Sequence, residues 1–237
     1  NGANPLVVDV SGNNTLMCAC TFNRLDNVKF WLKEFPDWDL EAGNTINGSV
    51  ALGATVYMGP NRLKFVEFLI QKGARCSALT HSGASVLIAA SGSEDADPSV
   101  VKLLLEHCNN VNHQQQSMTI KWYAIHSIAK AVVRTGLSQS LLMKYLAIER
   151  GETALHKASR RGDVEIVELL LAYGANPSLR NDLGLDAAAR CTSFPELQGV
   201  LEKRERKMKL RGTAKKTKAV EVLGKRISTA TPIQHAM

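Results

Sequence analysis

The sequence of 237 residues contains no apolar run near the roughly 18 residues that a membrane-spanning helix needs. Its densest apolar stretch, IVELLLA at 166–172, is short and includes a glutamate. A secretory signal peptide is also absent, and the chain begins at Asn1 rather than at methionine, which favours a fragment of a longer protein. We therefore expect a globular chain without a membrane span.

Cysteine is scarce and odd in number, which argues against a disulfide framework. The five cysteines, expected to be reduced in a cytoplasmic or nuclear protein, are Cys18, Cys20, Cys76, Cys108 and Cys191. Cys18 and Cys20 lack the partner pair of a zinc site, and His107, Cys108 and His113 are explained equally well as loop and core residues. We predict no metal and no cofactor.

Acidic residues are scarce only near the C-terminal end of the chain. The formal net charge of +7 conceals eleven Lys or Arg and three Glu between 202 and 226, which leaves the remaining sequence with eighteen basic and nineteen acidic residues. The body is therefore close to neutral, and any attraction to a polyanion belongs to the basic tail.

What the sequence does contain is a repeat. Gly151 opens the segment GETALHKASRRGD, which is followed by a second apolar helix, a glycine at 174 and the extended GANP. Similar segments recur, and glycines stand ten residues apart at 2 and 12, 73 and 83, and 174 and 184. The apolar anchor of each copy falls at Leu16, Leu52, Leu87, Ile125, Leu155 and Ala188. A period near 33 residues with a helix pair in each unit indicates an all-α solenoid.

The sequence resembles the ankyrin-repeat family. The resemblance rests on G-x-T-A-L-H-x-A at 151–158, on V-x-x-L-L followed by G-A-N at 167–176, and on the glycine-headed loops at 2, 73 and 174. Tetratricopeptide repeats have a similar period but do not predict these ten-residue loops. The resemblance implies helix–turn–helix units joined by loops resembling β-hairpins.

We predict an ankyrin-repeat domain over 1–201 and a basic helical extension with a disordered tail over 202–237. The predicted units are 1–11 (partial), 12–47, 48–82, 83–120, 121–150 and 151–183, with a capping repeat at 184–201. One connection departs from the pattern, because Leu146 to Gly151 takes five residues where Leu171 to Gly184 takes thirteen. Either a loop is absent there, the region packs irregularly, or the sequence carries a splicing artefact. We expect the weakest repeat interface at 120–165.

His156 is interpreted as a framework residue rather than a catalytic one. The resemblance implies that Thr153 and His156 hydrogen-bond to each other and to loop backbone, with His126 in the same place one copy earlier. No nucleophile or carboxylate pocket accompanies them, as a catalytic histidine would require. We therefore predict a monomeric, non-enzymatic module that binds a partner protein or peptide on its concave surface.

The family's contact positions lie at loop tips and at the exposed end of each first helix. Carried over to this sequence, the partner-binding residues are Phe22, Ile46, Tyr57, Met58, His81, Trp122, Arg160, Arg161, Arg180 and Asp182. The aromatic and aliphatic members would form an apolar anchor, and the Arg160–Arg161 pair would take an acidic segment. Alternatively, the aromatic and aliphatic residues pack in the core, and Arg160 and Arg161 form a solvated pair beside a turn.

The basic tail is the candidate for a second activity. Its charged residues include Lys203, Arg204, Arg206, Lys207, Lys209, Arg211, Lys215 and Lys216. The alternatives are a nuclear localisation signal, a contact to nucleic acid or acidic lipid, or a solvated helix end. No aromatic residues interleave with the charges, which argues against sequence-specific single-strand recognition. Two rival functions stay open: a targeting or regulatory part of a larger enzyme or channel, and a nuclear regulator.

Overall fold

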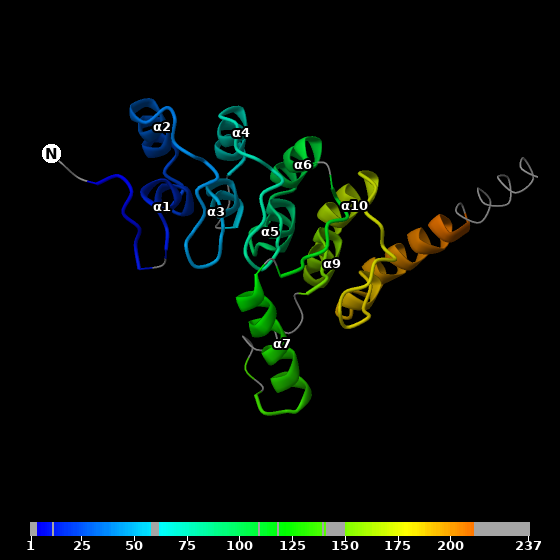
Figure 1. The fold of residues 1–237 in the computed structure, drawn as a ribbon. Helices are drawn as coiled ribbons and strands as arrows, with labels where there is room; N and C mark the ends of the chain where they lie inside the picture. The colour runs from blue at the N-terminus through cyan, green and yellow to red at the C-terminus, as the bar shows by residue number, and fades with distance from the viewer. Residues whose placement is uncertain are drawn as a thin grey trace, which may run out of the picture.

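The computed structural model describes residues 4–10, 12–57, 62–108, 110–117, 119–138, 140 and 150–210. Over these residues the chain forms two layers of short helices (Figure 1). The helices are α1 (Thr15–Thr21), α2 (Leu25–Glu34), α3 (Ala51–Tyr57), α4 (Leu63–Gln71), α5 (Val86–Gly92), α6 (Pro98–His107), α7 (Ile120–Arg134), α9 (Ala154–Arg161), α10 (Val164–Ala172) and the short 3-10 helix η1 (Ala188–Arg190). Residues 195–210 are also helical.

Side-chain caps set where several helices begin. Asn14, Ser85 and Thr153 each accept a hydrogen bond from the backbone N–H three residues later, at the starts of α1, α5 and α9. Asp163 does the same at the start of α10, directly after the left-handed Gly162 that ends α9. These caps satisfy N–H groups that a helix leaves unpaired at its first turn, so the helix pair of each unit is marked by local sequence.

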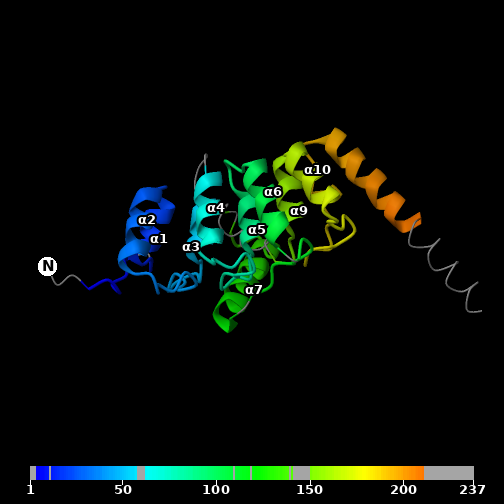
Figure 2. The same cartoon turned by 90° about the horizontal axis from the view of Figure 1, so that it is seen from above.

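The core is continuous through neighbouring units. Inner helices pack in the order α1, α3, α5, α9, and outer helices α4, α6 and α10 pack in a parallel row (Figures 1 and 2). Four predicted anchors, Leu16, Leu52, Leu87 and Leu155, are at most 2% exposed. The all-α ankyrin-like solenoid predicted from the sequence is thus confirmed in the described residues.

The hairpin loops share one hydrogen-bond pattern. Gly83 donates its N–H to the carbonyl of Thr80, and Gly184 donates to that of Asn181. Both glycines adopt a left-handed φ, 79° and 77°, which disfavours any residue with a side chain. Two residues fill the tip of each loop, and the loops tie neighbouring units together through bonds such as that from His81 N–H to Asn47 O, at 2.7 Å.

The repeat predicted at 121–150 is corrected by this pattern. Gly151, at φ 76°, donates to the carbonyl of Gln115 at 2.7 Å, and Gln115 N–H donates to Glu152 O at 2.9 Å. Gln115 and Gly151 are therefore the two sides of one hairpin loop, whose tip holds residues 116–150 as an insertion. Helix α5 packs directly on α9 across this point, so the stack does not lack a loop there. The weakest interface predicted at 120–165 stays a prediction.

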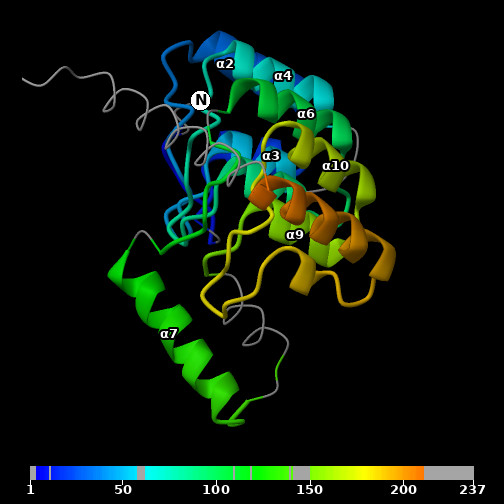
Figure 3. The same ribbon diagram turned by 90° about the vertical axis from the view of Figure 1, so that its right-hand side faces the viewer.

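Helix α7 lies within the insertion and stands away from the stack (Figures 1 and 3). Ile125, predicted as a repeat anchor, lies on this helix and is only partly buried. At the far end of the chain, the helix at 195–210 extends from the last described unit (Figure 2). Among the described residues, no helix has the length and apolarity needed to cross a membrane. The other predicted unit boundaries stay as predictions.

Candidate functional site

One hollow of the described surface is a groove of about 420 Å³ along the inner helices. Helices α1, α3 and α5 contribute its length, and the hairpin loop at 78–85 contributes one side. Gln115, Trp122 and Lys157 line the end toward the insertion and α9. The groove crosses several units, as the concave surface of a repeat stack does.

Small residues on α3 and α5 contribute much of the groove lining. Gly53 and Ala54 come from α3, and Ala89 and Gly92 come from α5. Because these residues carry at most a methyl group, a bound segment can approach the helix backbones closely. A Cβ added at Gly53 would lie 2.9 Å from Ser49 Oγ, and one added at Gly92 would lie 3.4 Å from Lys157 Cδ.

Two predicted contact residues lie on this groove. Tyr57 is the last residue of α3 and is 53% exposed. Trp122 comes from the first turn of α7, where Thr119 caps the helix by accepting from Trp122 N–H, and its ring meets His126 edge-on at 5.8 Å. The two aromatics therefore reach the groove from separate parts of the chain.

A buried ion network lies at the end of the groove. The Glu152 carboxylate, whose residue is 0% exposed, holds Lys157 Nζ at 3.3 Å and Arg190 Nε at 2.9 Å. Burial lowers the pKa of Arg190, while the neighbouring Glu152 charge opposes that shift. Lys157, the charged residue among those that line the groove, is thus held in an ion pair rather than presented to a ligand.

His156 has the framework contacts that the resemblance implied. Its Nδ1 lies 3.2 Å from Thr153 N–H, and its Nε2 lies 3.0 Å from Leu185 O in the next loop. Nδ1 must accept and Nε2 must donate for both bonds to form, which requires the neutral ring protonated at Nε2. Burial lowers the pKa of His156, which favours that neutral form.

His126 does not repeat this arrangement, contrary to the prediction. It lies in the middle of α7, is 0% exposed, and places Nδ1 2.9 Å from Ser117 Oγ. His156, by contrast, is the third residue of its helix and completes a capping box. The local similarity of YAIHSIA to a repeat misassigned His126, because the insertion helix has its own apolar spacing.

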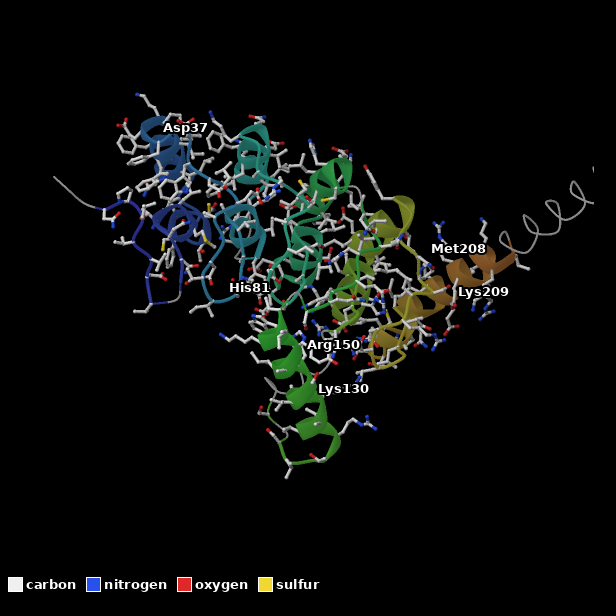
Figure 4. All side chains as sticks on the ribbon, in the orientation of Figure 1. Asp37, His81, Lys130, Arg150, Met208 and Lys209 are labelled. Atoms are coloured by element: carbon white, nitrogen blue, oxygen red, sulfur yellow. The ribbon has the colours of Figure 1, made fainter. Side chains whose placement is uncertain are left out.

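The remaining predicted contact residues are dispersed. Phe22, 71% exposed, lies on a separate hollow of about 590 Å³ beside α2, and Ile46 is 49% exposed at a loop tip. His81 points its Nδ1 at Ile46 O at 3.2 Å on the loop side of the stack (Figure 4). Met58 lies outside the described residues.

Several of the charged residues predicted to contact a partner instead bond to loops of the stack. Arg161 donates to Glu94 O across to the α5–α6 connection, and Arg160 is partly buried. Arg180 donates to Gly184 O at 2.8 Å within its own loop. Asp182 receives Arg150 at 3.1 Å, which joins the end of the insertion to the next loop beside α7 (Figure 4).

The described part of the basic extension is an exposed helix. Arg206 pairs with Glu202 at 3.3 Å and Lys209 with Glu205 at 2.7 Å, both one turn apart. The hydrogen bond from Lys209 lowers the pKa of Glu205. Lys203, Arg204 and Lys207 are also exposed. The predicted tail residues Arg211, Lys215 and Lys216 lie outside the described residues.

Sequence reasoning missed several groove residues. Gln115 and Lys157 line the groove, but in the sequence Gln115 is one of three consecutive glutamines and Lys157 is one residue of a repeat motif. The one sequence signal for the hairpin that Gln115 closes is Gly151, which corresponds to the loop-closing glycines Gly83 and Gly184. Among the described residues, no cluster of three or more potential metal ligands occurs.

Stacked helix pairs joined by hairpin loops define a helical repeat protein that presents an open surface. A family model described as ankyrin repeats, three copies, matches residues 86–181. Residues 86–181 are therefore similar to ankyrin repeats, as the sequence resemblance predicted. BRCA1-associated RING domain protein 1 of Caenorhabditis elegans is 28% identical over 93 residues. That match covers 39% of this chain and 13% of the length of the relative.

Proposed function

We propose that the protein is a non-enzymatic module that binds a segment of a partner protein in the groove of the inner helices. The observation that carries the proposal is the approach of Tyr57 and Trp122 to one groove from α3 and from the insertion. Aromatic residues beside a concave surface commonly supply most of the binding free energy of an interface. Ankyrin repeats, found at 86–181, are typically protein-binding repeats.

The groove favours an extended segment whose central residues are uncharged. Its lining is mainly small, aliphatic or hydroxyl-bearing, and Lys157 is buried in an ion pair with Glu152. A charged side chain placed there would lose water without gaining a free counter-charge, which disfavours binding. An apolar or aromatic side chain could instead pack beside Tyr57 or Trp122 while its backbone lies over Gly53 and Gly92.

A peptide-display selection against the full chain provides the test. A selected groove-binding peptide should bind Tyr57→Ala and Trp122→Ala at least tenfold more weakly, which corresponds to about 1.4 kcal/mol. Phe30→Ala and Ile128→Ala are matched controls, since both residues are exposed, 65% and 60%, and neither lines the groove. Unchanged affinity in both aromatic variants, with native-like unfolding, would reject the groove as the binding site.

Fewer observations support the two rival functions. A targeting or regulatory part of a larger enzyme or channel, and a nuclear regulator whose basic helix contacts nucleic acid, both stay as predictions. Deletion of 203–226 with a localisation assay tests the second, and steep salt dependence would mark binding to a polyanion. A cytoplasmic or nuclear location and a monomeric state are likewise proposed, on the reduced cysteines and the repeat class expected from the sequence.

A further inference from the structure

Cys76 and Cys108 meet where two neighbouring units pack together. Cys76 lies in the turn after α4, and Cys108 directly follows the last residue of α6. The Cys108 thiol donates to the Cys76 backbone carbonyl, with an Sγ–O distance of 3.7 Å, which brings the two thiols close enough to interact. Both side chains pack against the core yet stay partly exposed, so a small solute can reach them.

The two thiols have opposite acid–base character. The hydrogen bond from Cys108 lowers the pKa of Cys76 to about 7; partial burial opposes the shift and the nearby His107 supports it. The same contact raises the pKa of Cys108, which stays a thiol. A thiolate is the nucleophilic form of cysteine, so Cys76 can attack an electrophile. The neighbouring Cys108 thiol can then react with the modified Cys76 sulfur.

The other cysteines lack this combination. Burial raises the pKa of Cys20 to about 12 and also raises that of Cys191. Cys18 is held near Asp9, and partial burial together with that carboxylate raises the pKa of its thiol. These three thiols are therefore weak nucleophiles at neutral pH, although Cys18 and Cys20 are close in sequence.

We propose that Cys76 and Cys108 are an oxidation site at which a peroxide forms a disulfide between neighbouring repeats. The Cys76 thiolate attacks one peroxide oxygen, the O–O bond breaks, and a sulfenic acid forms while hydroxide leaves. The Cys108 sulfur then attacks the Cys76 sulfur, and its proton leaves with the sulfenic hydroxyl as water. Two thiols and one hydrogen peroxide thus yield one disulfide and two water molecules.

The cross-link would join the loop after α4 to the residue that follows α6, and these two helices already pack together. It would fix the spacing of the α3–α4 and α5–α6 units, whose inner helices line the groove. A disulfide also restricts the unfolded chain, which stabilises the folded state when native geometry is kept. Oxidation is therefore expected to stiffen the middle of the stack and to raise its melting temperature.

The test treats the reduced full chain with one equivalent of hydrogen peroxide, followed by non-reducing peptide mapping. The expected product links Cys76 to Cys108 within one chain, forms at least tenfold faster than any other disulfide, and raises Tm by about 5 °C. Its rate should rise with pH around a midpoint near 7. A midpoint near the ordinary thiol value of about 8.5, or a dominant Cys18–Cys20 or intermolecular link, would overturn the proposal.

Variants separate the two roles. Cys108→Ser should stop the reaction at a sulfenic acid on Cys76 that dimedone traps, and Cys76→Ser should slow oxidation of Cys108 at least tenfold. Cys191→Ser is the matched control and should keep the cross-link. If the serine variants unfold, the peptide map of the unaltered chain decides alone, since absence of the Cys76–Cys108 link there contradicts the assignment.

Discussion

Gly151 donates its backbone N–H to the carbonyl of Gln115 at 2.7 Å, as Gly184 does to Asn181 at 2.8 Å. The two bonds close the same hairpin in successive loops, yet residues 116–150 separate one pair and only 182–183 the other. The stack therefore continues from α5 and α6 directly to α9 and α10, and α7 belongs to a segment inserted at a loop tip.

Replacing 116–150 by Asp–Leu, the pair found at 182–183, should leave the stack folded. The hydrogen bonds of Gln115 to Gly151 and Glu152 join residues on the two sides of the insertion, and α5 already contacts α9. Far-UV circular dichroism should lose helical signal while unfolding stays cooperative. Loss of hydrogen-exchange protection in α5 and α9 would contradict the assignment of 116–150 as an insertion.

Neutralising Glu152 should strongly destabilise the protein. Glu152→Gln leaves the cations of Lys157 and Arg190, whose side chains are 4% and 12% exposed, without their counter-charge. Breaking a buried ion pair in this way typically costs about 3–5 kcal/mol. The measurement is the free energy of unfolding from urea titration. Asp26→Asn is the control, because the exposed Asp26–Lys29 pair should contribute less than about 1 kcal/mol.

His156 should make stability depend on pH below neutrality. Burial lowers its pKa in the folded state, so below about 6.5, the ordinary value, the unfolded chain binds a proton that the folded chain does not. The free energy of unfolding should consequently fall as pH decreases from 7 toward 5.

The variant His156→Gln removes the titrating ring but keeps an acceptor for Thr153 N–H, as in a capping box. It should be less stable at pH 7, by about 1 kcal/mol for the weakened bond to Leu185 O, with a flatter decline toward pH 5. Identical pH slopes in the two proteins, measured by urea unfolding, would show that His156 does not cause the decline.

Glycine substitutions should separate backbone strain from steric contact. An added Cβ at Gly151 would lie 2.8 Å from Asp182 N, whereas at Gly184 it would meet nothing within 4 Å although φ is 77°. Gly184→Ala should cost about 1 kcal/mol, and Gly151→Ala more. Gly199→Ala, in an open helical position, should instead stabilise by about 0.5–1 kcal/mol. Thermal unfolding of the three variants gives this order, and equal losses at 151 and 184 would refute it.

Much of the stack could be predicted because the same residue types recur at the same packing positions of each unit. Leu16, Leu52, Leu87 and Leu155 recur where inner helices meet, and a glycine recurs where the loop needs a left-handed φ. The insertion was misassigned because α7 also buries one side, through His126 and Ala129. Apolar spacing alone does not tell which neighbour a helix packs against.

The groove could be predicted only in part. Tyr57 and Trp122 stood out as large residues at contact positions, although Trp122 reaches the groove from the insertion rather than from a repeat. The small residues Gly53 and Gly92 carry no comparable signal, since glycine in a short helix is equally compatible with close packing. The sequence does not distinguish Lys157 from a solvated lysine, whereas the structure pairs it with the buried Glu152.

The affinity of the Asp–Leu replacement variant for a groove-selected peptide tests the central claim most directly. This variant keeps Tyr57 and the small groove residues of α3 and α5 but removes Trp122, so calorimetry should show binding weakened at least tenfold in a protein that still unfolds cooperatively. Full affinity in that folded variant would contradict the account, because the insertion would then contribute nothing to the binding groove.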